Sequence, residues 1–363
     1  MLYPIIVTPE SVGVVCRIPL RLARNPYLMI SDTLAHPFRG TRCLVTGGAG
    51  FIGCNLTRLL LNAGAHVTVL DNFAVGKRDH LPVPSDALTI IEGDLCSLET
   101  LPDLVNTADY VFHLAAQVGN IKSLEQTEQD AKTNVLGSVR LFRACRNTSV
   151  KKVVYSSSSA IFGEAQRIPI DEEHPGAPAS FYALSKLTGE NYALLAASLW
   201  GVPIISLRYF NVFGLPMEYN EYTGVISIFF NRLGAGEPLI IYGDGHQFRD
   251  FVYVADVVQA NMRAAVTGRP GTVYNIGSGQ ASTIRQLAET MIEITGRKSK
   301  IMFENVRAGE VRESLADIRR AKAELSYAPV YDLRRGLAEM WEQISHTGRA
   351  EDTFSTHVWA QTQ

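Results

Sequence analysis

Short apolar runs alternate with amphipathic stretches from residue 41 onward. The amphipathic stretches, at 51–64, 133–146 and 181–200, have helical spacing. Several of the apolar runs do not alternate with polar residues, which is typical of strands covered on both faces. The strand-like runs are TRCLVTG (41–47), HVTVLDN (66–72), LTIIEGD (88–94), DYVFHLAA (109–116), KKVVYSSSS (151–159) and VPIISLRY (202–209). This order predicts an α/β fold, a doubly wound parallel sheet of the Rossmann type.

The pattern loosens after residue 211, where GLPMEYNEYTG and GAGEP have the composition of loops. We therefore expect a smaller mixed α/β lobe, with the chain returning to the sheet near TVYNIGSG (272–279). The predicted organisation is a loosely ordered N-terminal extension (1–40), a Rossmann-type domain (41–211, with a return at 251–279), a smaller lobe (212–250 and 280–345) and a tail (346–363).

Composition narrows the class of protein. The apolar content of 46 % suits a globular core, and no apolar run is long enough to predict a membrane span. A net charge of −2 gives no reason to expect a nucleic-acid partner. The five cysteines show no CxxC spacing, so we expect reduced thiols in a cytoplasmic protein, with neither a disulfide framework nor a metal site.

The segment TGGAGFIG places Gly47, Gly50 and Gly53 between a predicted strand and a predicted helix. A glycine permits the positive φ of a tight turn, and a second lets a pyrophosphate approach the backbone N–H groups at the helix start. The third allows the helix to pack closely on the strand. This context predicts a dinucleotide site.

Asp71 ends the next predicted strand, 18 residues beyond Gly53. A carboxylate at about this distance accepts hydrogen bonds from the adenosine ribose and repels a 2′-phosphate. Asp71 therefore favours NAD over NADP, although the nearby cations Lys77 and Arg78 leave NADP open.

Tyr182 and Lys186 stand four residues apart in SFYALSKLTGE, so they share one face of the predicted helix. Ionising a tyrosine near neutral pH requires its pKa to fall by about three units, or about 4 kcal/mol. A partly buried ammonium group and a cationic nicotinamide can supply that stabilisation. The serine-rich strand end YSSSSAIFG precedes this helix and could place a hydroxyl beside the phenol.

These motifs together resemble the extended short-chain dehydrogenase/reductase family, and within it the NAD-dependent nucleotide-sugar 4-epimerases. The resemblance covers residues 41 to about 345. Its further motifs are GDL (93–95), HLAAQ (113–117), TNVLGS (133–138), RYFNVFG (208–214), GDGHQFRDFVYVADV (243–257), NIGSG (275–279) and RAGEVRESLAD (307–317).

The resemblance implies a role for each matching residue. The catalytic residues would be Ser158, Tyr182 and Lys186. NAD would be held by Gly47, Gly50, Phe51, Ile52, Gly53, Asp71, Asn72, Asp94, Leu95, Leu114, Ala115, Ala116, Gln117, Asn134, Tyr182, Lys186 and Phe210. A UDP-sugar substrate would be held by Ser158, Tyr182, Asn211, Val225, Arg249, Arg307, Glu310 and Ser314. Paired arginines suit a diphosphate, because guanidinium offers two donors to its oxygens.

The residues directly after Ser158 distinguish epimerisation from dehydration. Dehydratases of this group usually carry an acid directly after the catalytic hydroxyl, whereas Ser159 and Ala160 stand here and cannot titrate in that role. Inversion at C4 through a transient 4-keto sugar is therefore favoured. A dehydratase or 4-keto reductase of deoxysugar biosynthesis remains the alternative, and a noncatalytic NAD-sensing protein a remote one.

Ser314 bears on the substrate, because in the family a tyrosine at this position tends to exclude 2-acetamido sugars. A serine leaves room for an N-acetyl group without requiring one. UDP-N-acetylhexosamine and UDP-hexose therefore both stay open, with a UDP-hexuronate third. The family also implies a homodimer formed by two helices from each subunit, and the stretches 133–146 and 181–200 would serve.

Overall fold

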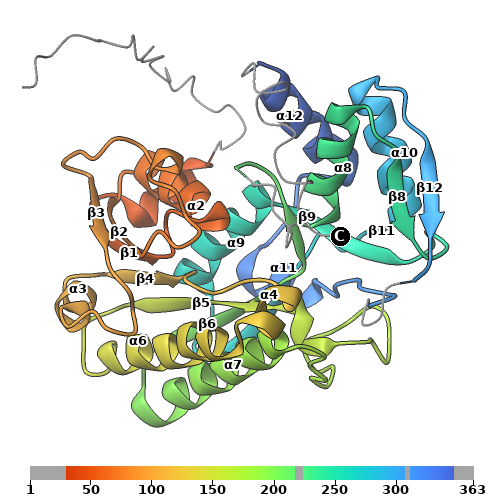
Figure 1. The fold of residues 1–363 in the computed structure, drawn as a ribbon. Coiled ribbons are helices and arrows are strands. Elements are labelled where there is room, and N and C mark those ends of the chain that lie inside the picture. The colour runs from red at the N-terminus through yellow and green to blue at the C-terminus, as the bar shows by residue number, and fades with distance from the viewer. Residues whose placement is uncertain (1–29, 217–223, 307–310, 347–363) are drawn as a thin grey trace, which may run out of the picture.

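A computed structural model of the chain describes residues 30–216, 224–306 and 311–346. Its centre is a seven-stranded parallel sheet in the order β10-β6-β5-β4-β1-β2-β3 (Figure 1). The strands are β1 (Arg42–Thr46), β2 (His66–Asp71), β3 (Leu88–Glu92), β4 (Tyr110–His113), β5 (Lys152–Ser158), β6 (Ile204–Tyr209) and β10 (Thr272–Ile276). Each lies within a run that the sequence predicts as a strand. The predicted Rossmann-type sheet is confirmed.

Helices cover both faces of the sheet, which explains why its strands are apolar on both sides. One face packs against α2 (Phe51–Asn62) and α9 (Val254–Thr267), and the core there includes Val45, Phe112 and Ile205. The other face packs against α3 (Leu101–Asn106), α6 (Ser138–Ala144) and α7 (Phe181–Trp200), with Leu44 and Val153 in its core. Helices α6 and α7 lie side by side beneath the sheet (Figure 1).

Several of the remaining elements lie together at the upper right of Figure 1, among them β8, β12, α8, α10 and α12. A three-stranded sheet joins β11 (Ala281–Thr283), β9 (Phe248–Tyr253) and β7 (Asn211–Phe213), and β12 (Ile301–Glu304) pairs with β8 (Leu239–Tyr242). The other helices are α8 (Val225–Ala235), α10 (Ile284–Thr295), α11 (Arg319–Leu325) and α12 (Leu333–His346), the short α4 (Asn120–Glu125) and α5 (Thr127–Ala131), and the 3-10 turns η2 (Arg78–His80) and η4 (Ser159–Phe162).

Residues 30–40 correct one expectation. The sequence predicts a loosely ordered extension up to residue 40, but the chain forms α1 (Asp32–Ala35) and the 3-10 turn η1 (His36–Phe38). The Ser31 side chain caps α1, and Phe38 is fully buried, with its ring centroid 5.2 Å from that of Tyr110. Leu34 and Phe38 are four residues apart, so both reach the core.

The stretch 133–146 also differs from an ordinary helix. Residues Lys132–Gly137 form a π-helical turn, η3, which continues into α6. π-Helical turns inside helices frequently mark functional sites. Among the described residues, no helix is long and apolar enough to cross a membrane. The predicted tail (346–363) lies outside the described residues except for His346, which ends α12.

Candidate active site

The glycine turn is built as the dinucleotide motif requires. Gly47 has φ +69°, and a Cβ placed on it would lie 2.6 Å from the backbone nitrogen of Ala115. A Cβ on Gly53 would lie 2.1 Å from the carbonyl oxygen of Gly47. Gly50 caps α2 and has no side chain to bond its first N–H groups. These N–H groups at the positive end of α2 therefore suit the pyrophosphate of a dinucleotide.

Asp71 lies beside this turn at the end of β2. Its Oδ2 accepts the N–H of Ala49 at 2.9 Å and its Oδ1 accepts the N–H of Phe73 at 2.8 Å. Each oxygen keeps a further lone pair for a ribose hydroxyl. Arg78, one of the two cations that leave NADP open, is bound 2.6 Å from Glu92. This arrangement suits the 2′-hydroxyl of NAD.

Other residues predicted to contact NAD follow the carboxyl ends of β3 and β4. Asp94 accepts the N–H of Cys96 at 2.8 Å, and Leu95 is buried next to it. Leu114 donates its N–H to Thr46 and so extends the β1–β4 pairing toward Ala115, Ala116 and Gln117. Asn72 is exposed after β2. The structure therefore brings these residues to the carboxyl ends of the parallel strands, where the glycine turn also lies.

Asn134, which the resemblance implies as a cofactor contact, lies in η3, and its side-chain amide has several partners within the protein. The Oδ1 atom accepts the N–H of Gln117 at 2.8 Å, while Nδ2 lies 2.9 Å from the Gln117 carbonyl oxygen. Nδ2 also donates to Asp130 and to Ser185, both at 3.0 Å. The Asn134 side chain therefore holds the chain after β4 in place.

Ser158 and Tyr182 meet at the next strand end. Ser158 ends β5, and its Oγ accepts the N–H of Ala160 at 3.1 Å. Tyr182 lies in the first turn of α7. The Ser180 side chain caps that helix by accepting the N–H of Ala183. Burial raises the pKa of Tyr182, and the hydrogen bond from Ser158 lowers it.

Lys186 is buried one turn further along α7, with its Nζ 4.8 Å from the centroid of the Tyr155 ring. Burial lowers its pKa to about 8, while the charges of Asp130 and Glu190 oppose that shift. Burial therefore acts against charge on both groups, raising the pKa of Tyr182 and lowering that of Lys186.

Two acidic residues near Lys186 were missed from the sequence. Asp130 is buried four residues before Asn134, and Glu190 is buried four residues after Lys186. Glu190 forms an ion pair with Arg208 of β6 at 2.7 Å, which satisfies its charge. The four-residue spacing was the available signal, because it places each acid on the same helix face as its neighbour.

The predicted substrate residues in the second part of the molecule lie around β9. Arg249, on β9, donates to the carbonyl oxygens of Phe248 and Arg312. Ser314 donates its N–H to Phe248, so the segment carrying Ser314 runs beside Arg249. Phe210, Asn211 and Val225 lie at the end of β6, on β7 and at the start of α8. Arg307 and Glu310 lie outside the described residues.

The loop after Ser158 touches the segment that carries Ser314. Glu164 accepts the N–H of Arg312 at 3.1 Å, and Ile170 donates its N–H to Leu315 at 2.8 Å. These bonds bring the predicted substrate residue Ser314 toward the chemistry at the end of β5. The exposed Glu164 side chain therefore helps to hold the loop after Ser158 against the segment that carries Ser314.

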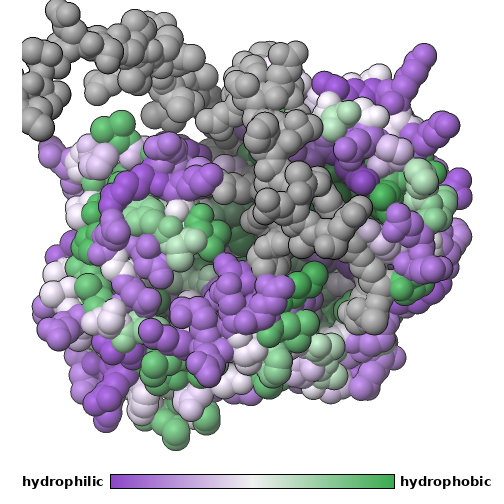
Figure 2. Space-filling model, in the orientation of Figure 1, coloured by the Kyte–Doolittle hydropathy of each residue, from purple (hydrophilic) through white to green (hydrophobic). Residues whose placement is uncertain are grey.

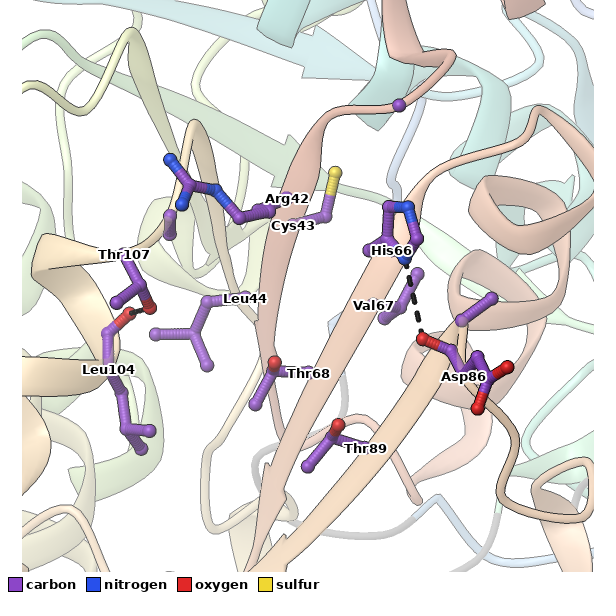
Figure 3. A pocket seen from close by; sticks show the side chains of 13 residues that line it. Arg42, Cys43, Leu44, His66, Val67, Thr68, Asp86, Thr89, Leu104 and Thr107 are labelled. Carbon is purple, nitrogen blue, oxygen red and sulfur yellow. Dashed lines mark hydrogen bonds between the residues drawn. The ribbon is translucent and has the colours of Figure 1, made fainter.

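A cavity of ≈ 580 Å³ lies at the opposite end of the strands, where β1 and β2 begin (Figure 3). Arg42 and His66, which begin β1 and β2, line it, together with Asp86, Thr89 and Leu104. The glycine turn and Ser158 lie at the carboxyl ends of their strands, where ligands bind in open α/β sheets. This cavity is therefore separate from the candidate active site.

Residues 43–277 match the family model of the NAD dependent epimerase/dehydratase family. The chain belongs to this family. The predicted family, the enzyme class and NAD as the cofactor are thereby confirmed, and the glycine turn and Asp71 fit that cofactor.

The chain is similar to named members of the family. It is 34 % identical over 309 residues to a putative UDP-glucose 4-epimerase of Methanocaldococcus jannaschii, covering 84 % of this chain and 99 % of that one. It is 34 % identical over 310 residues to a UDP-N-acetyl-alpha-D-glucosaminuronate decarboxylase of Bacillus cytotoxicus. That match covers 82 % of this chain and 96 % of the decarboxylase.

A solved structure is similar over the same region. It is a UDP-N-acetylglucosamine 4-epimerase from Methanobrevibacter ruminantium in complex with UDP-N-acetylmuramic acid. The two chains are 35 % identical with a TM-score of 0.81, covering 85 % of this chain and 99 % of that one.

Proposed function

We propose that this protein inverts C4 of a UDP-sugar. The observation that carries the proposal is the convergence of three residues: the Ser158 hydroxyl lowers the pKa of the Tyr182 phenol, and Lys186 is buried one turn further along α7. Ser159 and Ala160, the residues directly after Ser158, have no side chain able to act as the acid or base of a 4,6-elimination. The site therefore supports proton transfer at one hydroxyl, which is what epimerisation requires.

The protein groups would act on the proton of the sugar O4 hydroxyl. Tyr182, as phenolate, accepts that proton, and Ser158 orients the hydroxyl through its own hydrogen bond. Bound NAD, which the glycine turn and Asp71 would hold, would supply the acceptor and the donor of the C4 hydride. Tyr182 gives the proton back to O4 once the 4-keto sugar has turned and been reduced. Turning requires a firmly held nucleotide, and the guanidinium of Arg249 on β9 suits its diphosphate.

Two substrate classes fit Ser314. Its small side chain lies on the segment that runs beside Arg249 and meets the loop after Ser158. A serine there leaves room for a 2-acetamido group, so a UDP-N-acetylhexosamine is accepted as well as a UDP-hexose. A UDP-hexuronate is third. The relatives support this choice, since they are named for UDP-N-acetylglucosamine and for UDP-glucose.

Decarboxylation or dehydration is the second candidate. A relative is named as a decarboxylase of a UDP-N-acetylated uronate, and it is 34 % identical to this chain. Glu164 is the nearest acid after Ser158, but it lies on an exposed loop and accepts the Arg312 N–H. The described residues directly after Ser158 therefore favour epimerisation.

Incubation with UDP-glucose, UDP-N-acetylglucosamine and UDP-glucuronate in separate reactions tests the proposal. We expect NMR to show the C4 epimer of at least one of them, without accumulation of NADH. A 4-keto-6-deoxy sugar or a pentose product would instead identify a dehydratase or a decarboxylase. Binding of NAD with no product from any of the three sugars would favour the noncatalytic NAD-sensing alternative.

We also propose that two copies associate through α6 and α7. Helix α7 carries a row of large apolar side chains that are exposed although the helix packs on the sheet: Phe181, Leu184, Tyr192, Leu195 and Leu199. Leu136 of η3 and Ile121 and Leu124 of α4 are also exposed on elements that contact α7. Figure 2 shows hydrophobic residues at the lower edge, over α6 and α7. Such a row is typical of helices that form a bundle with a second subunit.

Light scattering tests this association. The wild-type protein should have the mass of a dimer, and Leu195→Glu should give a monomer because it places a charge in the apolar row. Val83→Glu is the matched control, since Val83 is an exposed apolar residue remote from α7. A monomeric wild-type protein would contradict the proposal.

A further inference from the structure

The buried ammonium of Lys186 lies over an aromatic ring. Its Nζ is 4.8 Å from the centroid of the Tyr155 ring, and the two residues are only 3 % and 1 % exposed. Within the part of the chain that the structure describes, Lys186 forms no ion pair with a carboxylate. A cation over the face of a tyrosine ring is attracted by the electron density of that face, and the attraction is largest where water is excluded. The ring therefore stabilises the charged form of Lys186, which burial opposes.

The Tyr155 ring is held in place by neighbours from other elements. Tyr155 belongs to β5, three residues before Ser158. Phe142 of α6 meets it in a T-shaped arrangement with ring centroids 5.6 Å apart, and His113 of β4 lies against it at 5.6 Å. Close packing on these sides fixes the orientation of the ring. The Lys186 ammonium therefore meets a face that is already in position.

The hydroxyl of Tyr155 contacts the backbone of α7 at the lysine itself. Its Oη donates a long hydrogen bond to the carbonyl oxygen of Lys186 at 3.4 Å. Gly189 makes room for this hydroxyl, because a Cβ on Gly189 would lie 2.3 Å from Tyr155 Oη. The same Cβ would lie 3.3 Å from the carbonyl oxygen of Asn134, so α7 also packs closely on η3 at this point. The glycine thus lets α7 approach β5 closely enough for the lysine side chain to lie over the ring.

We propose that Tyr155 is a positioning residue of this active site: its ring face carries the Lys186 ammonium, and Gly189 admits its hydroxyl beneath the turn of α7 that bears the lysine. The segment YSSSS, which begins at Tyr155, would then supply both a hydroxyl at Ser158 and a ring for the lysine. The proposal rests on the proposed function only for its effect on turnover, because the titration of Lys186 can be measured whether or not the protein is an epimerase.

Other titratable groups also face Lys186. Asp130 of α5 and Glu190 of α7 raise the pKa of Lys186, against the effect of burial. His113 of β4 is fully buried, and burial lowers its pKa to about 3, so its ring is neutral at neutral pH. Tyr182 lies one turn earlier on α7. All of these groups are retained when only position 155 is changed, so a difference in the lysine titration reports on the ring.

Titration of Lys186 by NMR tests the proposal directly. The protein is labelled with ¹³C at the ε carbon of lysine and saturated with NAD, and the Lys186 signal is the one that Lys186→Met lacks. Tyr155→Met removes the ring and keeps a large apolar side chain. The Lys186 signal should then titrate at a pH about one unit lower than in the wild-type protein. Tyr155→Phe keeps the ring face and should titrate like the wild-type protein.

A matched control separates the ring from a general loss of core packing. Phe112→Met removes another fully buried ring, which packs against Phe38 on the opposite face of the sheet. It should lower the temperature of thermal unfolding as Tyr155→Met does and leave the Lys186 titration in place. Equal shifts of the titration in these two variants would overturn the proposal.

Variants of Gly189 test the hydroxyl contact and do not require Tyr155→Met to fold. The Cβ of Gly189→Ala would clash with Tyr155 Oη, an atom that Tyr155→Phe lacks. The gain in helix propensity is the same in both backgrounds, so any difference in unfolding temperature reports the clash. Gly189→Ala should therefore be more harmful in the wild-type than in the Tyr155→Phe background, and it should lower the Lys186 titration only in the former. Equal effects in the two backgrounds would overturn the contact.

The outcome for Tyr155 and the outcome for the reaction are distinguishable. In an active enzyme the alkaline limb of the kcat profile should move to lower pH together with the Lys186 titration of Tyr155→Met. An unchanged Lys186 titration in folded Tyr155→Met would overturn the proposal. A shifted titration in a protein that forms no epimer would reject the proposed reaction and leave the role of Tyr155 standing.

Discussion

The Ser158 hydroxyl lowers the pKa of the Tyr182 phenol, although the two residues come from the end of β5 and the first turn of α7. The Ser158 Oγ already accepts the N–H of Ala160, which leaves its proton for the phenol oxygen. A donor aimed at that oxygen stabilises the phenolate more than the phenol, so it lowers the Tyr182 pKa. The serine and the tyrosine therefore act as a unit.

Replacing Ser158 by alanine should make the phenol a weaker acid. A hydrogen bond to a charged group contributes about 1.5–3 kcal/mol, so the acidic limb of the kcat profile should move up by about one to two pH units. At pH 7 this corresponds to a loss of about 10- to 100-fold in kcat. Ser157→Ala is the control, because the Ser157 hydroxyl has no hydrogen-bond partner among the described residues. Equal profiles for the two variants would contradict the pairing.

The charge on Lys186 should set the alkaline limb. Its pKa is lowered to about 8 by burial, so the ammonium is present below that pH and is lost as the pH rises through it. We expect kcat of the wild-type protein to fall above about pH 8, and Lys186→Met to be weakly active with no such fall between pH 7 and 9.5. A wild-type profile that stays level to pH 9.5 would show that the lysine charge is not required.

Gly53→Ala should disrupt the glycine turn. The new Cβ would lie 2.1 Å from the Gly47 carbonyl oxygen, which cannot move without shifting the turn. Overpacking of this kind typically costs about 1–3 kcal/mol of unfolding free energy, and NAD binding should weaken with it. Asn62→Ala is the control, at an exposed position near the end of the same helix. Thermal unfolding and NAD titration measure both effects, and a Gly53→Ala protein equal to the control would be inconsistent with the close packing.

Ser314→Tyr should change the substrate range. Ser314 is 7 % exposed on the segment that follows the Glu164–Arg312 contact, so a large ring there occupies space beside the sugar. We expect kcat/KM to fall by at least tenfold for UDP-N-acetylglucosamine and to change less for UDP-glucose. An equal loss for both sugars would mean that the position does not discriminate the 2-substituent.

The strands of the large sheet could be predicted because they are buried on both faces, so their sequences are apolar throughout. Helix α7 was also predictable over 181–200, since Ser180 caps its start and Gly201 adopts a left-handed conformation after its end. Apolar runs and helix-capping residues can be recognised from the sequence of the element itself.

Other features depend on contacts that no local pattern shows. The π-helical turn of Lys132–Gly137 has ordinary helical composition, and Asn134 is aimed by Asp130, Ser185 and Gln117 only once α5, α7 and β4 have assembled. The pKa of Lys186 is a further example. The sequence gives its spacing from Tyr182, but the burial that lowers the lysine pKa comes from the packed sheet.

Residues 30–40 illustrate the same limit at the start of the chain. Phe38 is isolated in a proline-containing stretch without periodicity, and only the assembled core shows that it packs against Tyr110 and Phe112. A single buried aromatic residue is enough to order a short segment because it removes a large apolar area from water.

The interconversion of C4 epimers by Tyr182→Phe tests the central claim most directly. The variant lacks only the phenol oxygen, so its fold and its NAD content should match the wild-type protein. With whichever UDP-sugar the wild-type protein accepts, NMR should show epimer formation slowed by at least about 100-fold, as expected when a general base is removed. Epimer formation at the wild-type rate would contradict the assignment of Tyr182 as the base.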